Sequence, residues 1–304
     1  MVSSINWVLF SGITRSSFPN EIPALNACLN PKSFNLSQKI TVVFWPQNLK
    51  TISIICQKGG VGKTTTVVNL SSIFSKKGYK TLIIDLDPQG NVSTYLNFDK
   101  NTDTITTSID LLEGVKSLNP GILNEKLSIV PSNKEILRNS EEKIIGGSKI
   151  SKLKKSGLFN GFDFIFIDTP PTMSSLVQEG IAASDYYIIP TKPEFLAIEG
   201  VAQAMDFAKK TLKNIPNINT IFLGVLLNQV ETKRSSYEDF LTELEYLLGD
   251  RLFKTKISHL TELADSPFYS KTVIDFNEDS KAKIEFNKLA EEIMERVGTN
   301  EKIT

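Results

Sequence analysis

Cysteine and histidine are scarce in this chain of 304 residues, and their scarcity excludes several classes of protein. Cys28 and Cys56 are too few for a disulfide framework and lack the spacing of a metal-ligand pair. His259 is the only histidine, and the sequence offers it no partner for a catalytic triad or a metal site. We therefore predict a reducing, cytoplasmic setting, with Cys56 as a small core residue and His259 as a structural or surface residue.

Long apolar runs and net charge are also absent. The longest apolar stretches, such as residues 220–227, have the length of a strand, whereas a membrane helix needs about 20 residues. The WVLF patch near the N-terminus has no basic flank, so we expect no signal peptide. The 34 basic and 34 acidic side chains cancel, so composition gives no support for a nucleic-acid partner, although it is compatible with a local basic patch.

Two regions of the chain differ in their patterns. Residues 1–50 have neither the period of a strand nor that of a helix, which predicts a poorly ordered N-terminal extension without a helix-turn-helix. Short apolar runs then alternate with helical periods, so we predict one domain over residues 51–304. Strands are expected at 51–56, 81–87, 127–132, 162–168, 185–190 and 220–227. Helices are expected at 62–77, 174–182, 196–213, 235–248 and 281–297.

The expected strands are rich in β-branched residues and show little polar alternation, which is typical of strands covered on both faces. They predict an α/β fold, a mostly parallel sheet flanked by helices on both faces. The helix at 235–248 places six apolar residues on one face, which we interpret as core packing. These residues are Tyr237, Phe240, Leu241, Leu244, Leu247 and Leu248.

The segment QKGGVGKTT, residues 57–65, lies between an expected strand and an expected helix. In that context a glycine-rich loop lets backbone N–H groups and a helix N-terminus approach phosphates. A simple glycine turn is the alternative, but it does not explain the Lys-Thr pair at the start of the helix. The predicted phosphate-binding residues are Gly59, Gly60, Val61, Gly62, Lys63, Thr64 and Thr65.

Aspartates follow two of the expected strands. Asp85 and Asp87 lie in DLDPQGN, and Asp87 is the better placed to orient or deprotonate a water molecule. A solvated turn is an equal alternative for this segment alone. Asp168 ends the apolar run FIFID, where a rigid strand would hold one carboxylate near Mg²⁺.

Four segments together resemble one family. KGGVGKTTTVVNLS, YKTLIIDLDPQGN, FDFIFIDTPP and DYYIIPTKPEFLAIEG are similar to the ParA/Soj branch of the ParA/MinD superfamily of deviant-Walker ATPases, which partition plasmids and chromosomes. TELADSPFYSKTVIDF also resembles a late segment of that branch, so the resemblance covers residues 51–297. It implies a P-loop NTPase fold of the deviant Walker type, with ATP and Mg²⁺ as cofactors.

The resemblance also implies roles for individual residues. Lys58 would reach the phosphates of a nucleotide in a partner subunit, where a second cation stabilises the transition state as an arginine finger does. Lys63 and the loop amides would bind the phosphates, and Thr64 and Asp168 would hold Mg²⁺. Asp87 would position the attacking water. The residues expected near the adenine are Pro190 and Asn228.

The resemblance implies a switch that forms a homodimer with ATP, binds DNA without sequence preference in that state, and is stimulated by a ParB-like partner. Its setting would be the cytoplasm, on the nucleoid when ATP is bound. The acidic, polar sequence AEEIMERVGTNEKIT argues against membrane recruitment. An ATP-dependent regulator of gene expression is the main alternative, and a cofactor-maturation ATPase is disfavoured because its cysteine ligands are missing.

No DNA-contacting residue can be assigned, because acidic residues are interleaved with the basic ones. The SKISKLKK run, residues 148–155, is compatible with either a basic patch or an exposed loop. The other basic candidates are Lys209, Lys210, Lys213, Lys233, Arg234, Arg251, Lys254 and Lys256.

Overall fold

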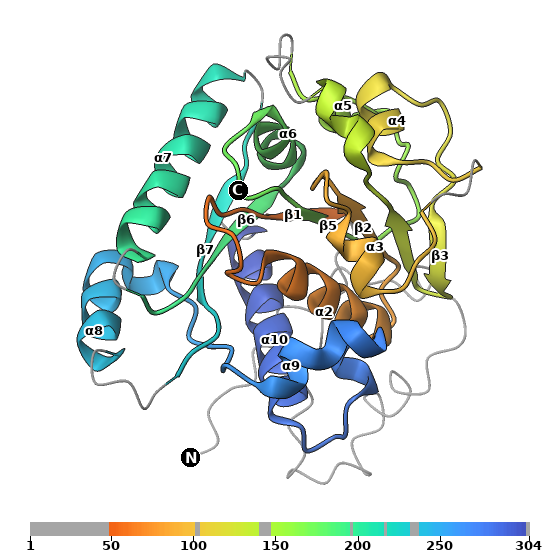
Figure 1. The fold of residues 1–304 in the computed structure, drawn as a ribbon. Helices are drawn as coiled ribbons and strands as arrows, with labels where there is room; N and C mark the ends of the chain where they lie inside the picture. The colour runs from red at the N-terminus through yellow and green to blue at the C-terminus, as the bar shows by residue number, and fades with distance from the viewer. Residues whose placement is uncertain are drawn as a thin grey trace, which may run out of the picture. The chain divides into compact units, whose positions relative to one another are not determined.

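The computed structural model describes residues 49–100, 104–139, 147–194, 197–215, 218–231 and 237–301 (Figure 1). The chain divides into two units, and the fold described below belongs to the second, Pro46–Thr304. The predicted N-terminal extension, residues 1–50, lies outside the described residues except for Leu49 and Lys50, and Lys50 already belongs to the first strand.

The described residues form one seven-stranded sheet in the order β3-β4-β2-β5-β1-β6-β7. All neighbouring strands pair in parallel except β3 and β4, which form an antiparallel pair at one edge. This confirms the prediction of a mostly parallel sheet. The strands are β1 (Lys50–Ile54), β2 (Thr81–Asp85), β3 (Gly121–Asn124), β4 (Leu127–Val130), β5 (Phe164–Asp168), β6 (Tyr186–Thr191) and β7 (Ile221–Leu227).

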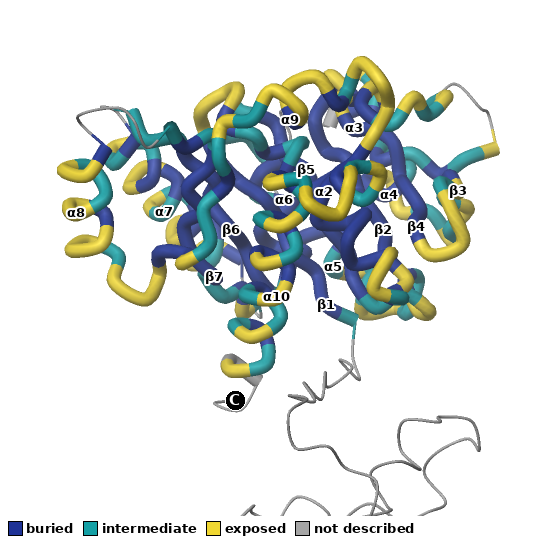
Figure 2. Tube along the Cα trace, turned by 90° about the horizontal axis from the view of Figure 1, so that it is seen from below, coloured by how far each residue is buried: buried dark blue, intermediate teal, exposed yellow. Residues whose placement is uncertain are grey.

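Helices cover both faces of the sheet (Figure 1). The helices α2 and α10 lie on one face, and α4, α5, α6 and α7 lie on the other. The strands between these layers are buried, while exposed residues gather on the outer helices and loops (Figure 2). The helices are α2 (Lys63–Lys76), α3 (Asn91–Tyr95), α4 (Ser108–Glu113), α5 (Lys149–Lys155), α6 (Ser175–Ala183), α7 (Ala197–Asn214), α8 (Tyr237–Leu248), α9 (Thr261–Asp265) and α10 (Lys281–Glu301). Short 3₁₀ helices are η3 (Lys134–Asn139), η4 (Gly249–Arg251), η5 (Ser266–Tyr269) and η6 (Val273–Asp275).

The predicted strands and longer helices are all present, but several short elements were not predicted. The segment at 148–155 is the helix α5 rather than an exposed loop. Ser148 caps it by accepting a hydrogen bond from the Ser151 amide, and the buried Glu179 carboxylate accepts bonds from the Ser148 hydroxyl and the Ile150 amide. Such capping contacts stabilise a short helix that the local sequence pattern alone does not predict.

One side chain of α8 was wrongly assigned to the core. Tyr237 and Leu244 are buried as expected, but Leu247 is 54 % exposed. Residues advance by about 100° along a helix, which places Leu247 at the margin of the stripe centred near Tyr237. The remaining predicted positions, Phe240, Leu241 and Leu248, are partly buried against the same core cluster.

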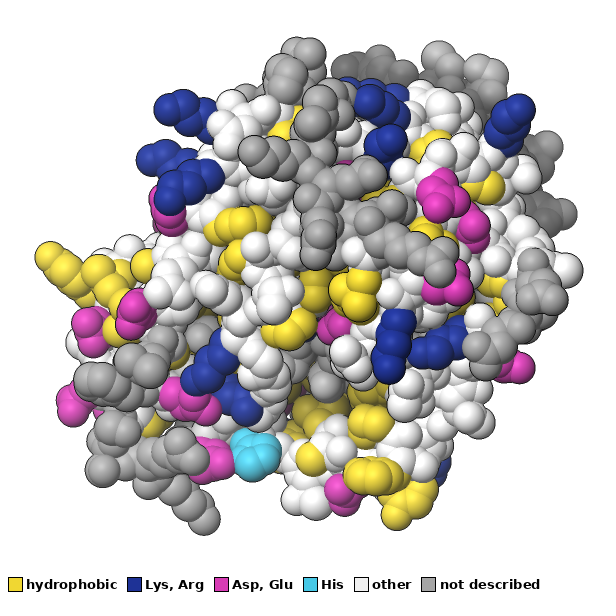
Figure 3. All heavy atoms as spheres, turned by 45° about the horizontal axis from the view of Figure 1, so that its top comes forward, with side chains coloured by type: hydrophobic (Ala, Val, Ile, Leu, Met, Phe, Trp, Pro, Cys, Tyr) yellow, Lys and Arg dark blue, Asp and Glu magenta, His cyan; other side chains and the backbone are white. Residues whose placement is uncertain are grey.

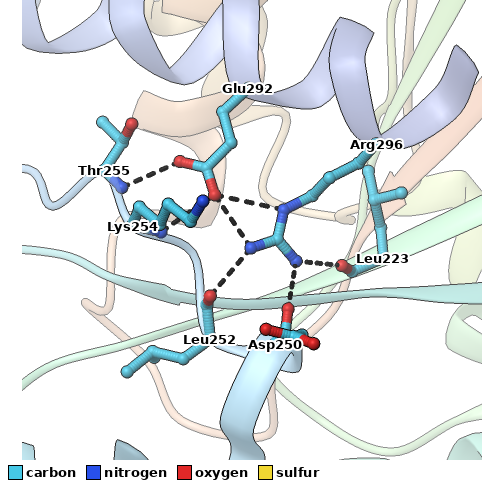
Figure 4. Close-up of polar contacts among 7 residues, drawn as sticks. All are labelled: Leu223, Asp250, Leu252, Lys254, Thr255, Glu292 and Arg296. Carbon is cyan, nitrogen blue, oxygen red and sulfur yellow. Dashed lines mark hydrogen bonds and ion pairs between the residues drawn. The ribbon is translucent and has the colours of Figure 1, made fainter. Parts of the chain in front are cut away.

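Arg296 of α10 joins the last helix to the β7 edge of the sheet (Figure 4). Its guanidinium donates hydrogen bonds to the backbone oxygens of Leu223, Asp250 and Leu252, and it also pairs with the Glu292 carboxylate. That carboxylate accepts bonds from the amides of Lys254 and Thr255. Burial raises the pKa of Glu292, but these amide bonds and the arginine outweigh it, so the pKa lies below the usual value.

Replacing Arg296 by leucine should lower the free energy of unfolding by about 2–4 kcal/mol, because three carbonyls lose their guanidinium donor and the largely buried Glu292 carboxylate loses its cation. Urea denaturation measures this loss. Lys210→Leu is the control, since the pair that Lys210 forms within the described part of the chain is an exposed one with Asp206 on α7, and its loss should cost under about 0.5 kcal/mol. Equal losses in the two variants would contradict the prediction.

Candidate functional site

Three strands end at the same level of the sheet and bring distant residues together. In the parallel register Ile54 of β1 pairs with Asp168 of β5, and Asp168 pairs with Asp85 of β2. The loop that follows β1 leads into α2, which begins at Lys63. The loop and the two aspartates therefore share the carboxyl edge of the sheet, where α/β folds bind their ligands.

The glycine loop has the backbone of an anion-binding turn. Gly60 and Gly62 have φ angles of 70° and 87°, and Gly62 is the N-cap of α2. A Cβ atom at Gly62 would lie 2.2 Å from Nδ2 of Asn228, so neither the conformation nor the space admits another residue. The first turn of α2 contains no acidic residue, which leaves its N-terminal amides available to an anion.

Lys63 lies beneath this loop. It is 7 % exposed, and its Nζ donates a hydrogen bond to the Lys58 carbonyl at 3.2 Å. Burial lowers the pKa of Lys63, and the neighbouring carboxylates of Asp168 and Asp87 partly offset that effect. An ammonium group in this setting is stabilised by an added anion.

Thr64 and Asp168 meet next to Lys63. The Thr64 hydroxyl donates to Oδ2 of Asp168 at 2.6 Å. Asp168 is fully buried, and its Oδ1 has no hydrogen-bond partner among the described residues. Burial raises the pKa of Asp168 to about 7, although Thr64 and Lys63 oppose the rise. An unpartnered carboxylate oxygen beside a hydroxyl is a ligand set that fits Mg²⁺, which takes one or two protein oxygens and completes its shell with water and phosphate.

Asp85 is buried behind the turn, whereas Asp87 lies on the turn itself. Asp87 is 5 % exposed, and its Oδ1 accepts a bond from the Gln89 amide. Asp85 is fully buried and accepts bonds from the amides of Asp87 and Val92, so it holds both ends of the turn that carries Asp87. Burial and the neighbouring Asp168 raise the pKa of Asp85 well above its usual value. The sequence pattern D-x-D contained Asp85, but its positioning contacts were not predicted.

Asn228 contacts the phosphate loop directly. Its Nδ2 donates to the Val61 carbonyl at 3.0 Å, and Nε2 of the next residue, Gln229, donates to the Gly60 carbonyl at 3.0 Å. Pro190 is buried in β6, opposite Leu226 of β7. The predicted adenine contacts of Asn228 and Pro190 stay predictions, whereas the contacts of Asn228 and Gln229 with the loop were not foreseen.

A cavity of about 120 Å³ adjoins the loop on the side of β7. It is lined by Lys192, Pro193, Glu194, Gln229, Glu231 and His259. His259 has a partner that the sequence did not reveal, since its Nδ1 lies 2.5 Å from Oε1 of Glu231. The surface position predicted for His259 agrees with its half-exposed side chain.

Lys58 lies on the outer side of the loop, unlike Lys63. Its side chain is 45 % exposed, and its Nζ forms an ion pair with the half-exposed carboxylate of Glu194. The two lysines of the loop are therefore separated, one buried beneath the phosphate turn and one on the molecular surface.

The basic candidates are dispersed over several elements. Lys209, Lys210 and Lys213 are exposed on α7, while Arg251 donates to the Phe222 carbonyl and Lys256 lies over the ring of Tyr237. Lys233 and Arg234 lie outside the described residues. Basic side chains occur in separate groups on the face shown in Figure 3, with acidic ones among them.

Comparisons with known proteins agree with this geometry. A family model described as "AAA domain" matches residues 49–221. The sporulation initiation inhibitor protein Soj of Bacillus subtilis is 29 % identical over 80 % of this chain and 98 % of its own length. The chromosome-partitioning ATPase Soj of Treponema pallidum is 28 % identical over 82 % of this chain and 98 % of its own length. A putative plasmid partition protein of Borrelia burgdorferi, solved with AMPPNP, has a TM-score of 0.64 and 24 % identity, and covers 84 % of this chain and 100 % of that one.

The fold and the loop define a P-loop ATPase, and the chain belongs to the AAA-domain family. Within that family it is of the ParA/Soj type, as the sequence resemblance predicted. The matched residues, 49–221, include the strands β1 to β6, the glycine loop and the helices α2 to α7.

The buried charge of Asp168 predicts a pH dependence in the metal-free protein. A carboxyl whose folded pKa is raised to about 7 destabilises the folded state as pH rises from about 4 through 7. Asp168→Asn removes this charge, so the variant should be more stable than the native protein at pH 8, with the difference shrinking toward pH 5. Urea denaturation of the variant and of the native protein, at pH 5 and pH 8 and in the presence of a chelator, measures these stabilities. A variant less stable than the native protein at pH 8 would contradict the prediction.

Proposed function

We propose that this protein is an ATP-hydrolysing dimeric switch for partitioning plasmids or chromosomes, which binds DNA in its ATP state and is stimulated by a ParB-like partner. The observation that carries the proposal is the separation of the two loop lysines. Lys63 is buried beneath the phosphate turn, whereas Lys58 lies half exposed on the outer surface. A cation in the second position is available to the nucleotide of another subunit.

Nucleotide binding would use the buried half of the site. Lys63 and the amides of Gly60 and Gly62 at the start of α2 would hold the phosphates. Thr64 and the free oxygen of Asp168 would hold Mg²⁺, which supplies charge neutralisation on the phosphate oxygens when it is bound. Asn228, bonded to the Val61 carbonyl, would couple this loop to the end of β7.

Hydrolysis would depend on Asp87 and Lys58. Asp87 would orient the attacking water, and Asp85 would keep Asp87 in place by accepting bonds at both ends of its turn. Lys58 would leave Glu194 to reach the phosphates of the second subunit. An exposed ion pair stabilises a protein by only about 0–1 kcal/mol. Breaking the contact between Lys58 and Glu194 would therefore cost little when Lys58 moves to the second subunit.

Replacing Lys58 by alanine should lower ATP turnover by roughly 10³-fold, because the cation that acts across the dimer is lost, and should leave ATP binding within about threefold. Lys63→Ala should instead abolish detectable binding. Lys77→Ala is the matched control, since Lys77 is exposed at the C-terminal end of α2, away from the loop, and its ion pair among the described residues is with Glu291 of α10. Steady-state turnover measures the loss of hydrolysis, and equilibrium binding of a fluorescent ATP analogue measures the loss of binding. Unchanged turnover of Lys58→Ala would refute the proposal that Lys58 acts on the nucleotide of a second subunit.

The part of the proposal that concerns DNA is supported by the relatives, whose names include chromosome-partitioning ATPases. A dimer would have to bring together basic groups that are dispersed in one chain, such as those of α5 and α7. No described helix is long and apolar enough to cross a bilayer. By likeness to the chromosome-partitioning relatives, the proposed setting is the cytoplasm, on the nucleoid when ATP is bound.

Binding to random-sequence duplex DNA should occur with ATP and Mg²⁺ and be lost with ADP or without nucleotide. Affinity in the ATP state should fall by at least about tenfold between 50 and 200 mM salt, because phosphate contacts release counterions. Fluorescence anisotropy of a labelled duplex measures both dependences. Equal binding in all nucleotide states would refute the switch.

A regulator of gene expression is the second candidate. It is favoured by the name of one relative, which describes an inhibitor of sporulation initiation. The same DNA measurement separates the two candidates, since absence of DNA binding in every nucleotide state would favour a regulator that acts through protein partners.

A further inference from the structure

An exposed aromatic pair lies on η5, outside the site described above. Phe268 is 86 % exposed and Tyr269 is 71 % exposed, although both are large apolar side chains. They are consecutive in a tight 3₁₀ turn that ends at Ser270 in the left-handed conformation. Single exposed apolar residues are ordinary, but two adjacent aromatic rings on one rigid turn form a candidate contact surface.

The turn is anchored to the elements that carry the nucleotide site. Ser266, the first residue of η5, is buried and shares a hydrogen bond of 2.5 Å with the hydroxyl of Tyr95 in α3. Tyr95 in turn accepts a bond from Nδ2 of Asn69 in α2, and Asn69 also binds the Thr65 carbonyl and the Val273 amide. These buried contacts fix η5 relative to the helix that begins at the phosphate loop.

The anchoring places the aromatic pair on the face that contains the loop. α9, which leads directly into η5, lies in front of α2 in Figure 1 and at the carboxyl edge of the sheet in Figure 2. Lys58, whose proposed target is a nucleotide in a second subunit, belongs to the same edge because its loop follows β1.

We infer that the η5 turn, with Phe268 and Tyr269 at its centre, is a contact surface for a second copy of this chain in the nucleotide-bound dimer. The inference rests on the proposed function, which requires a dimer through the loop face. Two turns related by a two-fold axis would bring four rings to the interface, about 600 Å² at roughly 150 Å² each, against about 1,200–2,000 Å² in a stable interface. The pair would therefore supply a large part of the apolar area.

The charges beside the turn also suit a second copy. Asp265 and Lys271 are both exposed and flank the aromatic pair in the chain. A two-fold interface presents the same patch from both sides, so a patch with one acidic and one basic end is complementary to itself.

The test compares dimer formation in four full-length proteins by sedimentation velocity with AMPPNP and Mg²⁺. Phe268→Ser/Tyr269→Ser should raise the dimer Kd at least about tenfold, as loss of central aromatic contacts does. Phe268→Leu/Tyr269→Phe should stay within about threefold of the native protein, because the apolar area is largely kept. Tyr246→Ser is the matched control, since Tyr246 is 87 % exposed and belongs to α8, a helix that lies away from α9 in Figures 1 and 2.

Melting temperature and binding of an ATP analogue show whether a loss of dimer formation comes from the contact surface, from misfolding or from a failure of the proposed function. The serine variants should keep the native melting temperature and bind a fluorescent ATP analogue as monomers within about twofold of the native affinity. A dimer Kd that is unchanged in Phe268→Ser/Tyr269→Ser, or equally weakened in Tyr246→Ser, would overturn the inference while the proposed function stands. A native protein that forms no dimer with AMPPNP and Mg²⁺ would overturn both.

Discussion

Parallel pairing of β1, β5 and β2 is the constraint on which the site depends. The register sets Ile54, Asp168 and Asp85 at one level, although they are far apart in the sequence. The loop after β1 therefore starts beside the Asp168 carboxylate, and Thr64 reaches it from the first turn of α2. Large buried side chains such as Phe164 and Phe166, which contact Phe74 of α2, hold the strands and this helix together. A shift of one residue in this register would reverse the faces of these rings and move the aspartates away from the loop.

The electrostatics of the site are unfavourable in the protein alone. Asp85, Asp87 and Asp168 are buried close together, and burial also disfavours the charge of Lys63. Hydrogen bonds from the Asp87 and Val92 amides satisfy Asp85, but one oxygen of Asp168 has no partner among the residues that the structure describes. The folded protein therefore holds charged groups whose electrostatic free energy improves most when an anion binds beside Lys63 and a cation binds to Asp168. This is the expected character of a preorganised phosphate site.

The sequence predicted those parts of the fold that rest on local patterns. The apolar runs gave the parallel strands, and the glycine-lysine-threonine series gave the loop and the start of α2. The strand β3 was missed because it is a four-residue edge strand with only its first residue buried, and α5 because Glu179 stabilises it from another helix. In the site, Asn228 and Val61 are 167 residues apart and Lys58 and Glu194 are 136 apart. Contacts over such separations arise from tertiary packing, which no local period encodes.

Arg296, which joins α10 to the β7 edge of the sheet, also determines when this edge can finish folding during synthesis. The Leu223 carbonyl on β7 receives its bond from Arg296, which is 73 residues further along the chain. A ribosome adds about 5–20 residues per second, so this edge waits several seconds for its partner. During that interval the Leu223 carbonyl lacks this donor, and the apolar face of β7 that packs on α10 is uncovered. Exposed edges of this kind favour pairing with another chain. We therefore expect the completed helix α10 to limit association through β7, and nascent chains that stop before residue 296 to lack the Arg296 contact.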